Sequence, residues 1–191
     1  MTSIRALALT AALLAGASAG CRGSEAAIEV APPAVAPELA PSRIQTGDVG
    51  VFENTDKSTK KAFADTPNAM VADGKLWELR KGERLVGTLQ ISTVKAKVDL
   101  TEARQRNAIL RSIISSRVEE LDVGEQTVWV SASEEKVVYV WFGSNLYEVL
   151  VLKEKDLDYE AVLREVLAHQ QASEAWSPLP ITEEDLEETS S

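Results

Sequence analysis

Residues 136–152 read KVVYVWFGSNLYEVLVL, two apolar runs separated by Gly143-Ser144-Asn145. Valine, tyrosine, tryptophan and leucine in runs of this length favour β-strands, and the small polar residues between them favour a tight turn. We therefore expect strands over 136–142 and 146–152, joined by a two-residue turn at Ser144-Asn145. Because the length of a turn fixes the pairing register, this hairpin also predicts which side chains share a face.

The two faces of the predicted hairpin differ in character. One face suits packing against helices and carries the pairs Phe142–Tyr147, Val140–Val149 and Val138–Val151. On the other face Trp141 lies beside Glu148, and a three-residue turn over 134–136 adds Trp129 opposite Trp141. An aromatic cluster on an uncovered sheet face is typical of a binding site. The candidate partner-binding residues are Trp129, Tyr139, Trp141, Glu148 and Leu150. If residues 49–72 fold over this face instead, it forms a second small core.

The remaining periodicities predict an α+β fold. Further strands are expected over 75–80, 84–93 and 126–132, with a possible edge strand over 49–52 and a possible short helix over 56–64. A helix is predicted from the capping box Asp99-Leu100-Thr101-Glu102 to about Leu121, and another begins at Asp158 as its N-cap. The order ββαβββα predicts one antiparallel sheet of about five strands with two helices packed on one face.

The first 21 residues have the pattern of a bacterial export signal. Arg5 precedes an apolar run over 6–15, which is followed by small residues and by Ser18-Ala19-Gly20-Cys21. This ending resembles the lipobox of bacterial lipoproteins, with Ser18 where leucine is usual. The resemblance implies a signal peptide over 1–20 and a diacylglycerol on Cys21, with fatty acids such as palmitate. Cys21 is the only cysteine of the chain, so an internal disulfide is impossible and lipidation gives the thiol a role.

Two locations follow from two patterns of cleavage. Under the lipoprotein interpretation, acyl chains on Cys21 anchor the protein in the cell membrane or outer membrane, facing outside the cytoplasm. In bacterial lipoproteins an aspartate directly after the cysteine is a signal for retention at the inner membrane. This chain has Arg22 at that position, so the resemblance favours the outer membrane. The competing pattern Ala17-Ser18-Ala19 fits ordinary signal cleavage and would give a soluble secreted protein that begins at Gly20.

Composition predicts four regions. After the signal, residues 21–47 are rich in alanine and proline and predict a flexible tether behind the lipidated cysteine. Residues 48–170 suit a single α+β domain, and 171–191 predict a disordered acidic tail. The formal net charge of -10 makes nucleic acid an improbable partner on electrostatic grounds.

The sequence offers little catalytic chemistry. It has one histidine, His169, and neither a nucleophile elbow, a phosphate loop nor a metal-ligand pattern, so we expect no cofactor, no metal site and no catalytic residues. The expected function is a non-catalytic binding module of the cell envelope, with another envelope protein as partner. Two alternatives stay open. One is a carrier that holds a small apolar ligand or lipid between sheet and helices, and the other is an envelope hydrolase that uses carboxylates, with Glu148 as the best single candidate.

Overall fold

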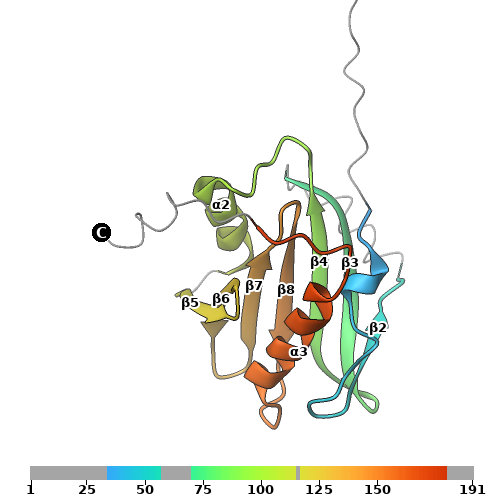
Figure 1. Cartoon of the computed structure of the whole chain (residues 1–191). Helices are drawn as coiled ribbons and strands as arrows, with labels where there is room; N and C mark the ends of the chain where they lie inside the picture. The colour runs from blue at the N-terminus through green and yellow to red at the C-terminus, as the bar shows by residue number, and fades with distance from the viewer. Residues whose placement is uncertain (1–33, 57–69, 115–116, 180–191) are drawn as a thin grey trace, which may run out of the picture.

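The computed structural model describes residues 34–56, 70–114 and 117–179, and these residues form one antiparallel sheet with helices on both of its faces (Figure 1). The signal peptide, Cys21, most of 56–64 and the end of the predicted tail lie outside the described residues. In chain order the elements are η1 (Pro37–Leu39), β1 (Arg43–Ile44), β2 (Val49–Glu53), β3 (Val71–Lys81), β4 (Arg84–Val94), α2 (Ala103–Ile113), β5 (Glu119–Val123), β6 (Gln126–Ala132), β7 (Val137–Phe142), β8 (Leu146–Leu152) and α3 (Tyr159–Gln171).

The sheet consists of two four-stranded meanders that meet in its middle. Its strand order is β1-β2-β3-β4-β8-β7-β6-β5, so β4 of the first meander pairs with β8 of the second. The α+β class and the antiparallel sheet are as predicted, but the described residues form eight strands rather than about five. The strands β1 and β5 were not predicted, and β2 was expected only as a possible edge strand over 49–52, whereas it lies between β1 and β3. The element order is ββββαββββα when η1 is left aside.

The two helices lie on opposite faces of the sheet, whereas the sequence predicted both on one face. Helix α2 packs through Ile109 and Leu110 on the face that carries Val140 and Phe142. Helix α3 packs through Val162 and its neighbours on the other face. The strands β7 and β8 are apolar on both sides, so each side needs a cover, as in sheets that are buried on both faces.

The β7–β8 hairpin has the predicted register. Phe142 pairs with Tyr147 and Val140 with Val149, around a turn in which Gly143 N–H donates to the carbonyl oxygen of Leu146 at 2.8 Å. In β4 a β-bulge shifts the register near the start of the strand. Val86 is buried there and Leu85 is 43% exposed, so the first residues of β4 depart from strict alternation with Leu89.

The prediction of one long helix from 99 to 121 was wrong at both ends. Asp99 accepts hydrogen bonds from the N–H and hydroxyl of Thr101, and Glu102 is the N-cap without a side-chain bond. The carboxylate of Asp99 therefore closes a local turn and does not cap the helix. At the other end Ile114 is extended, and the chain continues into β5, which pairs with β6.

The folded region extends beyond both predicted boundaries. Val35, Leu39 and Ile44 are at most 2% exposed, so the segment 34–47 belongs to the core and not to a tether. At the other end Ser144 N–H donates to the carbonyl oxygen of Ser177 at 2.9 Å, and Gly143 forms a β-bridge with Pro178. Residues 172–179 therefore lie across the end of the β7–β8 hairpin and are not part of a disordered tail.

Candidate functional site

Four of the five predicted binding residues are core residues. Trp141, Glu148 and Leu150 are 0% exposed, and Tyr139 is 6% exposed. The prediction that they form an accessible aromatic surface was therefore wrong, and α3 rather than residues 49–72 supplies the main cover. A partner protein cannot reach side chains that are buried between the sheet and α3.

A buried chain of hydrogen bonds joins this part of the sheet to α3. Trp141 Nε1 donates to Gln170 Oε1 at 3.1 Å, and Gln170 Nε2 donates to Glu148 Oε2. Burial raises the pKa of Glu148 well above its usual range, while the hydrogen bond from Gln170 acts in the opposite direction. The carboxyl group is thus held toward its neutral form inside the core.

The surroundings of Glu148 do not form an accessible carboxylate site. Its Oε1 atom has no hydrogen-bond partner in the described part of the chain, and the same holds for the buried hydroxyl of Thr93. Glu148 pairs across the sheet with Trp141 on one side and Ile91 on the other. The residue proposed for carboxylate chemistry is thus enclosed by apolar side chains, and its observed bond is structural.

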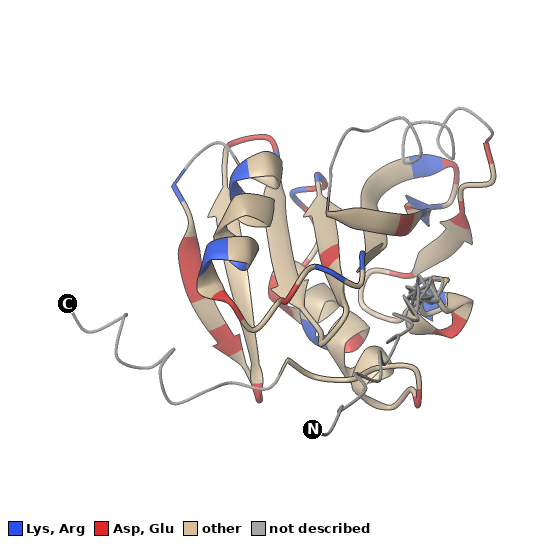
Figure 2. Ribbon diagram, turned by 90° about the horizontal axis from the view of Figure 1, so that it is seen from above, with Lys and Arg blue, Asp and Glu red and all other residues tan. Residues whose placement is uncertain are grey.

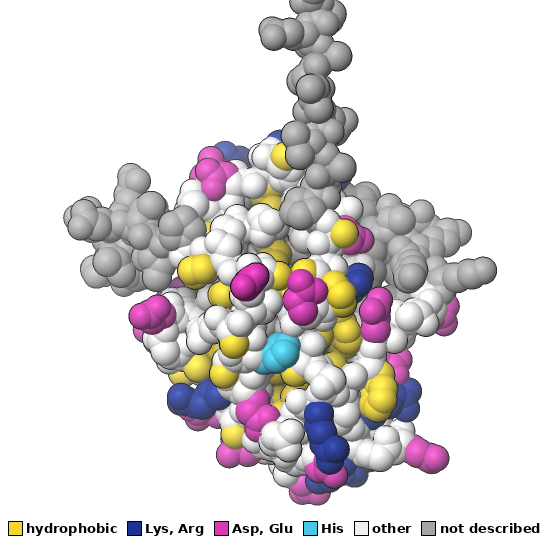
Figure 3. Space-filling model, turned by 45° about the vertical axis from the view of Figure 1, so that its right-hand side comes forward, with side chains coloured by type: hydrophobic (Ala, Val, Ile, Leu, Met, Phe, Trp, Pro, Cys, Tyr) yellow, Lys and Arg dark blue, Asp and Glu magenta, His cyan; other side chains and the backbone are white. Residues whose placement is uncertain are grey.

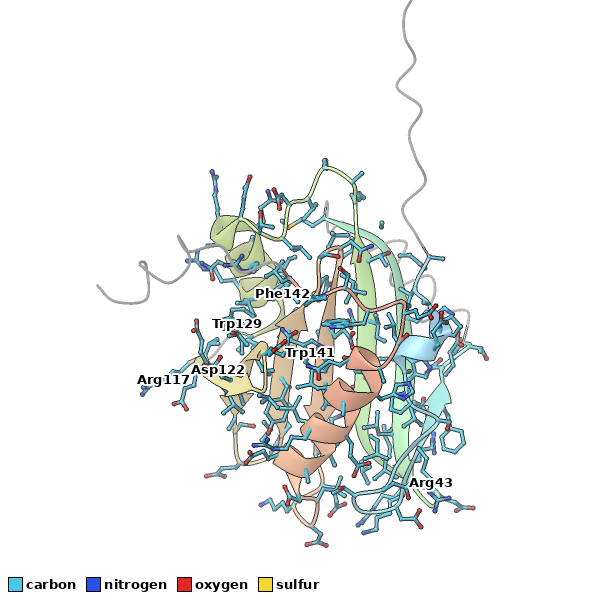
Figure 4. All side chains as sticks on the ribbon, in the orientation of Figure 1. Arg43, Arg117, Asp122, Trp129, Trp141 and Phe142 are labelled. Atoms are coloured by element: carbon cyan, nitrogen blue, oxygen red, sulfur yellow. The ribbon has the colours of Figure 1, made fainter. Side chains whose placement is uncertain are left out.

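Trp129 lies on the opposite face from Trp141, because β6 is shifted by one residue from the expected register. It pairs with Val140, and its ring meets that of Phe142 edge-on, with ring centroids 5.2 Å apart (Figure 4). Ser133 and Lys136 close a shorter turn than the predicted one, with Ser133 N–H donating to the carbonyl oxygen of Lys136 at 2.9 Å. A slip of one residue moves every side chain of a strand to the other face.

Trp129 forms one wall of a surface cleft between α2 and β5. The cleft has a volume of about 380 Å³ and is lined by Asn107, Leu110, Arg111, Ile114, Val118, Glu120 and Trp129. Apolar atoms come from the half-buried indole of Trp129, from Ile114 and from Val118, which is 36% exposed. Trp129 Nε1 donates to Glu120 Oε1 at 3.0 Å, which fixes the orientation of the indole. Small, partly apolar recesses with a few polar groups at their rim are typical binding sites.

The two sides of the cleft carry opposite charge. Helix α2 has Arg104 and Arg111 on its exposed side and no acid within its bounds, whereas β5 carries Glu119, Glu120 and Asp122 (Figure 2). Among the described residues, neither of these two arginines takes part in a salt bridge. In the cleft itself Arg111 lies on the α2 side and Glu120 on the β5 side, so it can bind charged groups beside the apolar side chains of Val118 and Trp129.

The only histidine of the chain has a structural contact. His169 is exposed on the surface of α3 (Figure 3), and its Nε2 donates to the carbonyl oxygen of Glu38 at 2.8 Å. It thus joins the last turn of α3 to η1.

Among residues 34–56, 70–114 and 117–179, no three His, Cys, Asp or Glu side chains are placed to hold a metal ion. None of the helices in these ranges is long and apolar enough to span a membrane.

Comparisons with protein-family models, with curated proteins and with solved structures found no match to this chain. The cleft is therefore interpreted from its own residues. Of its seven lining residues, sequence reasoning found only Trp129, and it placed that residue on the wrong face. The remaining six were not found, because the end of α2 and the start of β5 were predicted as one continuous helix that ran to about Leu121.

Proposed function

We propose that the protein is a lipid-anchored, extracytoplasmic binding module of the cell envelope, and that it binds an envelope protein in the cleft between α2 and β5. The observation that carries this proposal is the half-buried Trp129 beside exposed Val118 in a recess of about 380 Å³. Tryptophan is enriched among the residues that contribute most of the binding energy of protein interfaces. The recess is an open cleft at the surface, which favours side chains inserted by a partner over a lipid enclosed between sheet and helices.

The proposal of a lipid anchor depends on the first 21 residues. The export signal ends in Ser18-Ala19-Gly20-Cys21, and Cys21 is the only cysteine. The folded region begins by residue 34, so about 13 residues separate the cysteine from it, a reach of at most about 45 Å. Acyl chains on Cys21 would hold the domain beside the membrane and leave the cleft accessible to proteins of the same compartment.

A site-specific crosslink in intact cells tests the binding site. A photoreactive amino acid is placed at Val118 in the cleft, and a control is placed at Leu85, which is a similarly exposed apolar residue outside the cleft. We expect one partner species to be captured from Val118 and not from Leu85, through a single segment of its sequence. Trp129→Ala should abolish that capture while the protein stays folded.

The outcomes separate the functional alternatives. Equal capture from Val118 and Leu85, or capture that survives Trp129→Ala, would contradict the cleft as the binding site. A lipid that co-purifies with the wild-type protein in fixed proportion and is lost in Trp129→Ala would replace the proposed partner with a small apolar ligand.

A further inference from the structure

The strand β5 forms an open edge of the sheet beside the cleft. Among the residues that the structure describes, it is the last strand in the sheet order and pairs only with β6. The opposite edge is β1, which has two residues, whereas β5 has five. An open edge strand of this length can accept another strand through main-chain hydrogen bonds.

The hairpin geometry determines which backbone groups of β5 face outward. Val123 pairs with Gln126 around the two-residue turn Gly124-Glu125, so this closing pair is hydrogen-bonded within the hairpin. The alternation of an antiparallel ladder then directs the N–H and C=O groups of Glu120 and Asp122 away from β6. No backbone hydrogen bond between the described residues outside the regular ladders uses these outward groups.

The same two residues direct their side chains to the α2 face. Glu120 contacts Trp129 through its carboxylate, and Asp122 accepts a hydrogen bond from the hydroxyl of Thr127 at 3.1 Å. Figure 4 shows Asp122 and Arg117 at this margin of the sheet. A residue added opposite Glu120 would therefore place its side chain on the α2 face beside Glu120, at the outer side of the cleft, with Glu120 between it and Trp129.

Charge selects the kind of segment that fits. The edge and its turn carry four acids, at positions 119, 120, 122 and 125, against Arg117, which pairs with Glu119 at 3.7 Å. Arg111 is the one base among the lining residues of the cleft. A second copy of β5 would place acids opposite acids, which disfavours pairing. A lysine or arginine at that position can pair with Glu120 directly, and its long side chain can extend along the α2 face toward the indole of Trp129.

We infer that the partner binds by adding a basic, extended segment to the edge of β5, with lysine or arginine at every second position directed into the cleft. This inference rests on the proposed function and specifies the chemistry of the partner. Main-chain hydrogen bonds to Glu120 and Asp122 would give affinity, and the acidic edge with Trp129 would select basic side chains.

A labelled peptide, Lys-Val-Lys-Val-Lys-Val with blocked ends, provides the test. The probe is titrated with the full chain, purified from cells in an uncharged detergent, by fluorescence anisotropy at physiological salt. When the segment pairs antiparallel to β5, the residues opposite Glu120 and Asp122 are hydrogen-bonded partners, so the lysine N–H groups face β5. N-methylation of the three lysine amides should weaken binding at least about tenfold, whereas N-methylation of the three valine amides should leave it intact. The two peptides have the same charge and the same number of methyl groups.

Two variants of the protein give the complementary test. Asp122→Pro removes the outward N–H, a change that an edge strand tolerates, and Asp122→Asn removes the same charge but keeps the N–H. We expect Asp122→Pro to weaken peptide binding at least about tenfold more than Asp122→Asn does, with circular dichroism confirming that both variants fold. Equal binding of the two methylated peptides, equal effects of the two variants, or no binding of the parent peptide would overturn strand addition. If that happens while capture from Val118 still requires Trp129, the proposed function stands and only this inference fails.

Discussion

Gln170 on α3 donates a hydrogen bond to the buried carboxyl group of Glu148 on β8 and accepts one from the indole N–H of Trp141. One amide side chain thus satisfies polar groups on two neighbouring strands. Gln170→Ala would leave both of these buried groups without that partner. We expect a loss of about 2–5 kcal/mol in the free energy of unfolding, measured by urea denaturation at pH 6. Gln171→Ala, at an exposed position of the same helix, is the control and should change stability by less than about 0.5 kcal/mol.

Glu148 makes stability depend on pH. Its pKa is raised in the folded protein, so between the ordinary pKa and the raised one the folded state binds more protons than the unfolded state. The free energy of unfolding should therefore be highest below the ordinary pKa and fall as pH rises toward the folded value. Glu148→Gln should remove this part of the slope. Urea denaturation across pH 5 to 8 checks the prediction, and an unchanged slope in the variant would contradict it.

Glu165 should have the opposite pH dependence. Desolvation raises its pKa, but hydrogen bonds from Thr46 and from the backbone N–H of Gln45 together outweigh that effect and lower the pKa. The stability that these hydrogen bonds to the Glu165 carboxylate give the folded protein should be fully present above the ordinary pKa. It should be lost as the pH falls through the lowered pKa of the folded state. Glu165→Gln should cost about 1 kcal/mol at pH 7, a value reduced for solvent screening, and little at pH 3. A pH-independent cost would refute a role for the charge.

The two tryptophans of the β6–β7 pair should respond differently to truncation. Trp141 is 0% exposed, so Trp141→Ala should destabilise the protein by about 3–5 kcal/mol. Trp129 is only half-buried, so Trp129→Ala should cost about 1–2 kcal/mol and act mainly on partner capture. Chemical denaturation of both variants, combined with the crosslink from Val118, separates the two roles. The assignment would be wrong if Trp129→Ala were the more destabilising change.

The segment 172–179 should contribute to the stability of the domain. Trp176 packs on the core cluster beneath α3, and Leu179 packs on the cluster beneath α2. A chain that ends at Gln171 should therefore lose about 1–2 kcal/mol relative to one that ends at Leu179. A β-carbon at Gly143 would lie 2.9 Å from the carbonyl oxygen of Ser177, so Gly143→Ala should reproduce part of this loss. Thermal unfolding of the three proteins gives the comparison, and equal melting temperatures would contradict it.

The lipid anchor is tested at its attachment point. Cys21→Ala should shift the protein from the membrane fraction to the soluble fraction, because no acyl chain could then be attached. Mass spectrometry of the wild-type protein should show acylation of an N-terminal Cys21. An unmodified terminus at Gly20 would instead support the secreted form, and persistent membrane association of the variant would rule out Cys21 as the anchor.

The parts of the fold that could be predicted are those with local signals. Asn145 and its neighbours set the β7–β8 register, and Asp158 caps α3 through the N–H of Ala161, as its position before an apolar periodic run predicts. The prediction of the register was wrong at β6. There the turn Glu134-Glu135 contains none of the glycine or asparagine residues that mark two-residue hairpin turns.

Other features depend on tertiary contacts that the local sequence does not encode. Val118 and Leu121 continue the helical spacing of α2, but the β-branched Ile113 and Ile114 come at its end, and the chain there becomes extended. The turn Gly124-Glu125, with a positive φ at Gly124, was the signal that could have revealed β5. Val35 and Leu39 are isolated apolar residues among alanine and proline, so only their burial in the structure reveals that they belong to the core.

The junction between the two meanders has a consequence for the nascent chain. Gly87 of β4 pairs with Leu152 of β8, so the inner edge of the first meander stays open until the last strand has been synthesised. An unpaired edge that displays Leu89 and Ile91 is a template for wrong partners. Such late, long-range closure is intrinsically slow, and a chaperone that shields β4 would have its greatest effect before β8 arrives.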